Sequence, residues 1–267
     1  MTELQLILVI CGIVVGILII CLLLWLGNNL IKTTRYAIQF GGIEREIKIV
    51  QVSDLHGKQF SAHNSKLAAK IKNLNPDFIA VTGDIIHRYT PKDIKVALET
   101  VSTLSAIAPV LYVSGNHEMR NKGYRFFRKN IKEAGATVLD NKATEICGIT
   151  VVGLNGAHNK NETLFKITPD KPNKILFAHM PHYFANYAKA GYDLVLCGHA
   201  HGGQWRIPFA KQGVYAPGQG FFPKYTDGIH RSGNTKMIIS RGLGNSEFPL
   251  RLFNRPELVV ITLKPQT

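Results

Sequence analysis

The chain has 267 residues, 45% of them hydrophobic, and its 32 Lys and Arg residues outnumber its 18 Asp and Glu residues. Such a basic excess suits anionic lipid, acidic substrates or nucleic acid, or simply a solvated basic surface, and no aromatic residues interleave with arginine to favour nucleic acid as a partner. The four cysteines lack Cys-x-x-Cys spacing, so they favour neither a disulfide framework nor a thiolate zinc site.

The first predicted element is an uncharged, proline-free apolar run from Leu6 to Leu26. As a helix rising about 1.5 Å per residue, it reaches roughly 30 Å, the thickness of the hydrocarbon core of a bilayer. A cleaved secretory signal would need a basic stretch before this run, but the residues there hold Glu3 and no Lys or Arg. We therefore predict a transmembrane anchor over residues 1–31 and a single-pass membrane protein.

The residues after the anchor bear on its orientation. Trp25 lies at the end of the apolar run, where an indole suits the membrane interface, and Lys32 and Arg35 follow it. By the positive-inside rule, this basic flank places the C-terminal portion in the cytoplasm. With one span to test the rule, the extracytoplasmic side stays open. We expect residues 32–46 to be a juxtamembrane connector and residues 47–267 to be one catalytic domain.

Strand-like apolar runs alternate with helix-like segments in the first half of that domain. The predicted helices are Asn64–Leu74, Pro91–Ile107 and Gly123–Ala134, each closed by a Pro or Gly signal. Later the order changes, and strands follow with few helices between them: Ile149–Val152, Val214–Ala216, Met237–Ser240 and Leu258–Leu263. The sequence thus predicts an α/β fold with a second sheet, rather than one doubly wound sheet.

Five apolar runs, the first at Ile47–Ser53 and the last at Leu194–Cys197, end in residues that can ligate a metal. The blocks that follow the runs are Asp54-Leu55-His56, Gly83-Asp84, Gly115-Asn116-His117-Glu118, His179 and Gly198-His199-Ala200-His201. Taken alone, the last block could equally be two polar loop histidines above a core strand. In open α/β sheets, however, ligands gather outside the carboxyl ends of the strands, so we expect all five blocks in one crevice.

These residue types indicate the metal chemistry. Imidazole, carboxylate and amide oxygen suit divalent ions such as Mn²⁺, Fe²⁺, Co²⁺ or Zn²⁺, and there are too few carboxylates for a calcium cage. Seven candidate ligands are more than one ion needs. A carboxylate shared by two ions roughly 3.5–4 Å apart would turn water into hydroxide near neutral pH and grip a phosphoryl group.

In order and type, the five blocks resemble those of the calcineurin-like metallophosphoesterases, over residues Ile47 to Gln204. Three further motifs are similar to the membrane-associated branch with YkuE-type and YaeI-type phosphodiesterases and a UDP-diacylglucosamine hydrolase. These motifs are His201-Gly202-Gly203-Gln204, Ser240-Arg241-Gly242-Leu243-Gly244 and Asn254-Arg255-Pro256-Glu257. The family fold, a four-layer α/β/β/α sandwich of two mixed sheets, agrees with the change of pattern noted above.

The resemblance also implies a role for each residue. One ion would be held by Asp54, His56 and His201 and the other by Asn116, His179 and His199, with Asp84 bridging the two. A hydroxide between the ions would attack phosphorus, while His117 stabilises the transition state or protonates the leaving oxygen. Asp84 and His117 are thus the predicted catalytic residues. We expect two divalent ions, Mn²⁺ foremost, with Fe, Zn, Co or Ni as alternatives.

An anchor and a phosphoester-cleaving centre favour a phosphodiester or pyrophosphate substrate, and a lipid-linked one is attractive because anchoring keeps the site at head-group depth. The alternatives are a tethered phosphatase or nuclease acting on soluble substrates, and a non-catalytic membrane scaffold with the same fold. The scaffold is disfavoured because every expected ligand position is filled. The sequence does not predict the oligomeric state.

Some positions depart from the family pattern or have no motif around them. His87 follows Asp84 by three residues, and it could lie behind the ligands, face the substrate or lie on the surface. Asn155-Gly156-Ala157-His158 replaces residues that are often acidic in relatives. Three arginines could contact phosphate but are individually more typical of structural or surface positions: Arg120, Arg241 and Arg251. Three histidines are expected to be ordinary polar residues: His63, His182 and His230.

Overall fold

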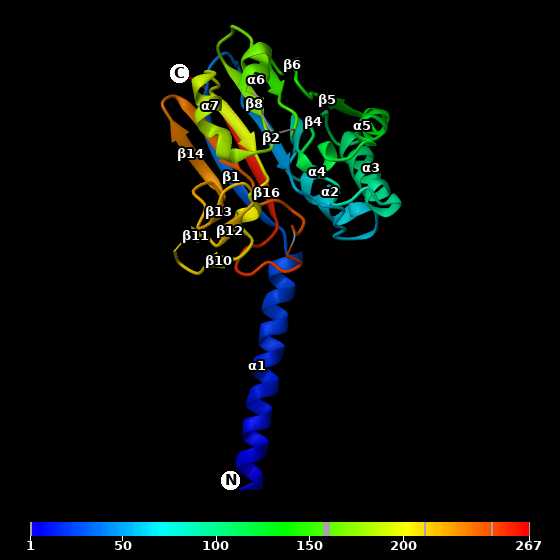
Figure 1. The fold of residues 1–267 in the computed structure, drawn as a ribbon, viewed down its shortest axis with the longest axis vertical. Helices are drawn as coiled ribbons and strands as arrows, with labels where there is room; N and C mark the ends of the chain where they lie inside the picture. The colour runs from blue at the N-terminus through cyan, green and yellow to red at the C-terminus, as the bar shows by residue number, and fades with distance from the viewer. Residues whose placement is uncertain (1, 157–160, 211, 247, 267) are drawn as a thin grey trace.

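The computed structural model describes residues 2–156, 161–210, 212–246 and 248–266. One long helix, α1 (Glu3–Asn29), projects from an α/β domain that contains the rest of the chain (Figure 1). Within α1 only Gly27 and Asn28, at the end next to the domain, are buried. The helix is long and apolar enough to cross a membrane, and it covers the run predicted to be the anchor.

The first sheet has six strands in the order β1-β16-β2-β3-β4-β5. Strands β2 to β5 run parallel, and β16 is antiparallel to β2 but parallel to β1. Strands β3 and β4 are continuous runs of buried residues and β2 is nearly so, as expected for strands covered on both faces, whereas the edge strand β1 alternates and is largely exposed or half-buried. Their bounds are β1 (Lys32–Phe40), β2 (Ile47–Val52), β3 (Phe78–Thr82), β4 (Val110–Val113), β5 (Ala136–Val138) and β16 (Glu257–Pro265).

The second sheet also has six strands, in the order β14-β15-β9-β8-β7-β6. Its central strands β15, β9, β8 and β7 are parallel, and the edge strands β14 and β6 are antiparallel to their neighbours. Their bounds are β6 (Lys142–Ile146), β7 (Ile149–Gly153), β8 (Lys174–Phe177), β9 (Leu194–Cys197), β14 (Gly228–Ser232) and β15 (Thr235–Ile239).

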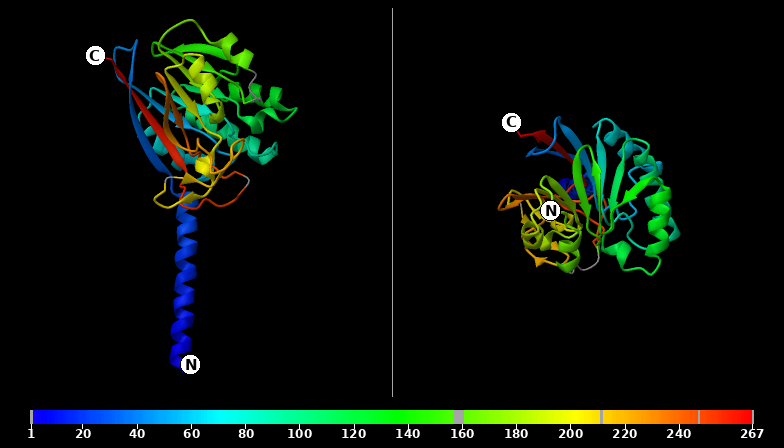
Figure 2. Two further views of the ribbon diagram at one scale, coloured as in Figure 1. Left: turned by 60° about the vertical axis from the view of Figure 1, so that its left-hand side comes forward. Right: turned by 90° about the horizontal axis from the view of Figure 1, so that it is seen from above.

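Three apolar cores hold four layers together (Figure 2). The middle core joins the inner faces of the two sheets, where Phe78 and Leu111 pack with Leu196 and Ile238. A second core lies under the helices on the first sheet: α2 (Ser65–Lys72), α3 (Pro91–Ser105) and α5 (Tyr124–Glu133). The third lies under the helices on the second sheet: α6 (Asn161–Ile167) and α7 (Phe184–Lys189). The predicted α/β/β/α sandwich is confirmed.

Short elements lie between and beside the layers. A single-turn helix, α4 (Asn116–Met119), follows β4 directly. Two small hairpins form from β10 (Arg206–Ile207) with β11 (Gln212–Gly213), and from β12 (Tyr215–Ala216) with β13 (Gly220–Phe221). Three 3₁₀ turns complete the chain: η1 (Ala62–Asn64), η2 (Pro181–Tyr183) and η3 (His201–Gly203). The hairpins lie where α1 joins the domain (Figure 1).

Three segments differ from the sequence-based expectation. Residues 32–46, expected to be a connector, instead include strand β1, which pairs with β16 along nine residues from Lys32↔Glu257 to Phe40↔Pro265. Leu258–Leu263 falls in β16 of the first sheet, not in the second sheet, and Val214–Ala216 contributes only to the β12–β13 hairpin. The cause is the same in each case, because strand partners distant in sequence leave no local pattern.

Candidate metal centre

The five blocks follow strands whose carboxyl ends lie at one edge of the sandwich. Asp54 and His56 come after β2, Asp84 after β3, and Asn116 starts α4 after β4. His179 follows β8 of the second sheet, and the pair His199 and His201 follows β9. All seven predicted ligands are buried. The structure therefore brings together residues that are up to 147 positions apart in the sequence.

Six of these side chains form two groups of three, in each of which the candidate ligand atoms lie within 4.8 Å of one another. The first group is Asp54, His56 and His201, with His56 Nε2 at 3.0 Å from His201 Nε2. The second is Asp84, His179 and His199, with Asp84 Oδ2 at 3.1 Å from His179 Nε2. Occupation of the groups by two ions stays a prediction.

Asp84 lies between the two groups. Its Oδ2 atom is 3.1 Å from His179 Nε2 in one group and 3.7 Å from His56 Nε2 in the other. Its second oxygen, Oδ1, accepts a hydrogen bond of 2.8 Å from the backbone N–H of His117, which fixes the direction of the carboxylate. This geometry suits an aspartate that two cations share.

Asn116 supplies a further oxygen. It is buried at the first position of α4, and its Oδ1 atom has no hydrogen-bond partner among the described residues. Because a buried amide oxygen without a donor is costly, such an atom indicates a missing electropositive partner. A divalent cation would supply it, which agrees with the predicted role of Asn116.

The backbone of the centre is strained. Asp54, His56, Asp84, His199 and His201 all have left-handed φ angles, between 46° and 67°. This conformation costs a residue with a side chain about 1–2 kcal/mol. Loop-to-loop hydrogen bonds hold it in place: the N–H of Asp54 donates to the Gly83 carbonyl and the N–H of His56 to the Asp84 carbonyl, both at 3.0 Å. Strain of this kind is typical of functional sites.

Positions 198 and 115 require glycine because atoms of neighbouring loops leave no room for a Cβ atom, and not because their φ angles are unusual. A Cβ atom on Gly198 would lie 1.9 Å from Ser53 Oγ and 2.3 Å from Asp54 Oδ2. A Cβ atom on Gly115 would lie 2.1 Å from Asp84 Oδ1. The glycines thus allow two acidic side chains to sit against neighbouring loops.

The protonation states suit cation binding. Burial lowers the pKa of His56 to about 3 and holds those of His199 and His201 well below their usual value, so these imidazoles are neutral and their lone pairs are available. Burial also opposes the charge on His179, but Asp84 and Asp54 outweigh it and raise its pKa to about 10. The Asp84 and Asp54 carboxylates thus stabilise a positive charge next to His179. The set of imidazole and carboxylate donors fits divalent ions.

A hydrogen bond to the ring nitrogen farther from the site orients His179. Its Nδ1–H donates to the carbonyl oxygen of Thr82 at 2.8 Å, so Nε2 points at Asp84 and His199, where a bound cation would displace its proton. A hydrogen bond to the far ring nitrogen is the usual way in which a protein fixes a ligating histidine.

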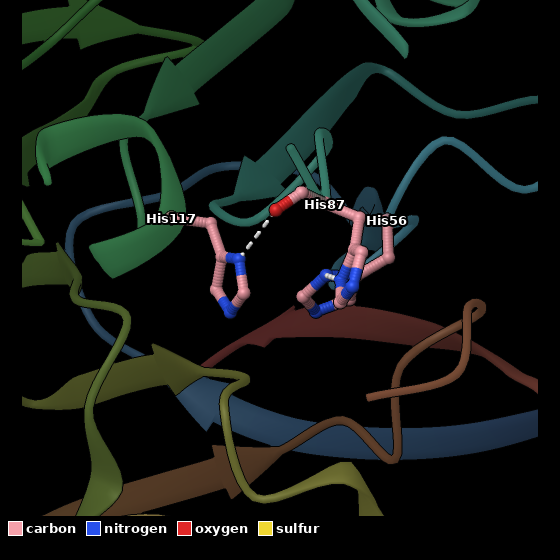
Figure 3. Close-up of side chains that lie close together, drawn as sticks. All are labelled: His56, His87 and His117. Atoms are coloured by element: carbon pink, nitrogen blue, oxygen red, sulfur yellow. Dashed lines mark hydrogen bonds between the residues drawn. The ribbon is translucent and has the colours of Figure 1, made fainter. Parts of the chain in front are cut away.

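His117 and His87 lie beside the first group, as Figure 3 shows. His117 Nδ1 donates to the backbone carbonyl of His87 at 2.7 Å, and its Nε2 lies 4.0 Å from Asp84 Oδ2. His87 Nδ1 is 3.3 Å from His56 Nδ1, and the rings of His87 and His117 stack at 5.3 Å. His87, whose role the sequence leaves open, therefore belongs to the site.

The structure adds three side chains that the sequence analysis did not assign to the metal centre, and Glu118 is the first of them. The buried Glu118 carboxylate accepts hydrogen bonds from the backbone N–H groups of Asp84, Ile86 and Gly115, at 2.9, 3.2 and 2.7 Å. Glu118 belongs to the block Gly115-Asn116-His117-Glu118, so the sequence motif was the signal that could have identified it.

Arg251 is fully buried, and its Nη2 atom lies 3.4 Å from His201 Nδ1. His182, expected to be an ordinary polar residue, has its ring 5.9 Å from that of His199. Neither position has a local sequence motif that could have placed it here.

The remaining candidates lie elsewhere or serve the fold. His63 pairs with Glu99 at the surface, and Arg241 pairs with Asp227. Arg120 is exposed, and His230 contacts the Asp227 carbonyl. The N–H of Gly156 donates to Ser114 Oγ at 3.3 Å, and the N–H of Asn155 donates to Asn141 Oδ1 at 3.2 Å. Ala157 and His158 lie outside the described residues.

The fold and the site together define an α/β protein with buried His and Asp groups at its strand ends that fit divalent metal ions. Residues 47–203 match the family model described as calcineurin-like phosphoesterase. The metallophosphoesterase YkuE of Bacillus subtilis is 30% identical over 256 residues, covering 90% of this chain and 88% of the relative. The phosphodiesterase YaeI of Escherichia coli is 28% identical over 225 residues, covering 81% and 82%.

Among solved structures, TT1561 of Thermus thermophilus overlays on 74% of this chain and 90% of its own, with a TM-score of 0.49 and 17% identity. The family match and the relatives decide the assignment. The chain belongs to the calcineurin-like phosphoesterase family, and it is a metal-dependent phosphoester hydrolase.

Proposed function

We propose that the protein is a membrane-anchored phosphodiesterase that uses two divalent ions, Mn²⁺ foremost, to hydrolyse a phosphodiester or pyrophosphate of a membrane lipid. The observation that carries this proposal is a direct connection between α1 and the metal centre. A site at the end of a membrane helix lies at the depth of lipid head groups, where a lipid phosphoester is also held.

The connection runs through Arg251. Its backbone N–H donates to the side-chain oxygen of Asn28, in the last turn of α1, at 3.1 Å, and its guanidinium lies 3.4 Å from His201. Lys58 makes a second contact with the end of α1, because its Nζ donates to the Asn28 carbonyl. One residue therefore separates the last turn of α1 from a candidate metal ligand.

The chemistry assigned to the residues follows from their positions. Asp54, His56 and His201 would hold one ion, Asn116, His179 and His199 the other, and Asp84 both. Divalent ions held there would lower the pKa of water and offset the negative charge of a phosphoryl group. His117 is turned by its bond to His87 so that Nε2 faces Asp84. We assign to His117 the delivery of a proton to the leaving oxygen.

The substrate assay compares two phosphoryl substrates, a lipid pyrophosphate and a soluble phosphodiester, with the full chain in lipid nanodiscs. One is a lipid-linked nucleoside diphosphate embedded in the disc, and the other is soluble bis(p-nitrophenyl) phosphate. We expect a much larger kcat/KM on the lipid, with both activities absent in Asp84→Asn. Turnover of the soluble ester with none of the lipid would favour a tethered phosphatase or nuclease. A chain with neither metal nor turnover would favour a scaffold.

The orientation can be tested with a native residue. Lys32 and Arg35 after α1 support a cytoplasmic domain by the positive-inside rule. Cys147 is exposed on the domain, whereas Cys11 and Cys21 lie within α1. In a Cys11→Ser, Cys21→Ser background, a membrane-impermeant maleimide should label Cys147 only after the inner membrane is permeabilised. Labelling in intact spheroplasts would contradict the cytoplasmic assignment.

A further inference from the structure

Large apolar side chains are exposed on one part of the domain. Outside α1, thirteen large hydrophobic residues are exposed in the described part of the chain, and nine of them fall in three short segments. We call these nine residues the loop face: Trp205, Ile207, Phe209, Phe221, Phe222, Phe248, Leu250, Leu252 and Phe253. Exposed apolar side chains concentrated in this way mark an interaction surface rather than ordinary scatter.

The three segments are in contact with one another. The rings of Trp205 and Phe248 lie 5.6 Å apart, and Trp205 Nε1 donates to the Leu250 carbonyl at 3.0 Å. The Phe221 ring lies 5.5 Å from that of Tyr215. Between the segments is a cleft of about 260 Å³, lined by Gln204, Trp205, Val214, Tyr215, Phe221 and Phe248. The loop face is thus one surface with an apolar recess.

This surface is continuous with the end of α1. The hairpins and the loop after β15 gather around the point where α1 meets the domain, in Figure 1 and in the left view of Figure 2. The backbone N–H of Arg251, between Leu250 and Leu252 of the loop face, donates to Asn28 of α1 at 3.1 Å. A helix that crosses a bilayer would therefore bring the loop face to the same bilayer.

The charges around the loop face also suit a membrane surface. Residues 204–226 and 248–255 hold no acidic side chain. Two basic residues flank the face: the exposed Lys224 lies over the Tyr225 ring, and the Nε atom of the half-buried Arg255 donates to the Leu30 carbonyl next to α1. Aromatic residues beside basic ones are typical of protein that sits at the interface of an anionic bilayer.

We propose that the loop face is a second bilayer-binding surface, which places its aromatic side chains among the lipids and admits an acyl chain into the cleft. This inference rests on the proposed membrane anchoring by α1. Two attachments, α1 and the loop face, hold the domain in one orientation. His201 lies three residues before Gln204, which lines the cleft, so the metal centre adjoins the surface that would meet the bilayer.

The chain carries its own probe, because its two tryptophans are Trp25 in α1 and Trp205 on the loop face. The full-length Trp25→Phe variant leaves Trp205 as the single tryptophan, and Trp205→Phe leaves Trp25. Each is placed in nanodiscs of ordinary lipid and of lipid brominated on the acyl chain near the head group, where bromine quenches tryptophan by contact. We expect strong quenching of both tryptophans in brominated lipid.

The outcomes separate the two proposals. Quenching of Trp25 without quenching of Trp205 would overturn the loop face as a bilayer-binding surface while leaving the anchor in place. Absence of quenching at both residues would mean that the proposed anchoring itself has failed.

A second set of variants tests whether the aromatic side chains cause the contact. Phe209→Asp combined with Phe222→Asp, in the Trp25→Phe chain, should reduce the quenching of Trp205 at least to half. Phe209 and Phe222 are exposed, so the changes leave the cores intact. Phe126→Asp is the matched control, because Phe126 is about as exposed as Phe222 but lies on α5. Unchanged quenching in the double variant, or an equal loss in the control, would contradict the proposal.

Discussion

Replacing Glu118 should destabilise the loops that carry the candidate metal ligands, because Glu118 hydrogen-bonds to their backbone. Its carboxylate holds three backbone N–H groups, of Asp84 and Ile86 after β3 and of Gly115 after β4. Glu118→Gln keeps the size of the side chain but replaces one acceptor oxygen by an N–H₂ group. At least one buried N–H then faces another donor.

The magnitude follows from these contacts. Burial raises the pKa of Glu118 to about 8, so near neutral pH its oxygens are largely uncharged acceptors, whose hydrogen bonds contribute about 0.5–1.5 kcal/mol each. A buried donor left without a partner costs about 1–3 kcal/mol, so we expect Glu118→Gln to lower the free energy of unfolding by about 1–3 kcal/mol. Glu118→Ala would leave all three donors unpaired, which roughly adds up to 3–9 kcal/mol, a large part of the stability of a typical domain.

The assay is denaturant unfolding of the metal-free full chain in mild detergent, with metal content measured in parallel. Because Glu118 holds the backbone of Asp84, the Gln variant should also bind less metal. Glu133→Gln is the control, since Glu133 is an exposed partner of Lys129 on α5 and such pairs contribute little. A Glu118→Gln chain with wild-type stability and metal content would refute the reasoning.

Three further changes separate the roles within the site. Asp84→Asn should abolish turnover and reduce the bound metal while the metal-free chain unfolds as the wild type does, and full activity in metal-replete buffer would contradict its bridging role. His117→Ala should retain the metal but lower kcat roughly 10²–10⁴-fold, the usual contribution of a positioned acid, and a loss of metal would instead make it a ligand. Removal of metal with a chelator should stop turnover and lower the Tm, and added Mn²⁺ should restore both. At a free-ion concentration of 100 times the Kd, each bound ion stabilises the fold by about 2.7 kcal/mol, so an unchanged Tm would indicate that no ion is bound tightly.

The site was predictable from the sequence because each chemical block directly follows an apolar strand. The position of Asp54 after β2 and of His199 after β9 places both at carboxyl strand ends, and those ends share one edge in an α/β sheet. Local sequence thus carries most of the information on which residues converge.

The contacts behind the site were not predictable in the same way. Arg251 lies 50 residues from His201 in the sequence, and no motif around it indicates burial. Strand β1 likewise pairs with β16 across more than 200 residues, so residues 32–40 could be expected only as a connector. What local pattern cannot show is which distant segment provides the partner.

Only Leu30 and Ile31 separate α1 from β1, the edge strand of the first sheet. Two residues extend at most about 7 Å, so this linker holds the domain close to the end of α1. With α1 in a bilayer, the catalytic domain could not move away from the membrane surface into the surrounding solution. If the substrate is the membrane lipid proposed above, enzyme and substrate would meet by lateral diffusion in two dimensions, and the rate would depend on the density of that lipid in the leaflet rather than on a bulk concentration.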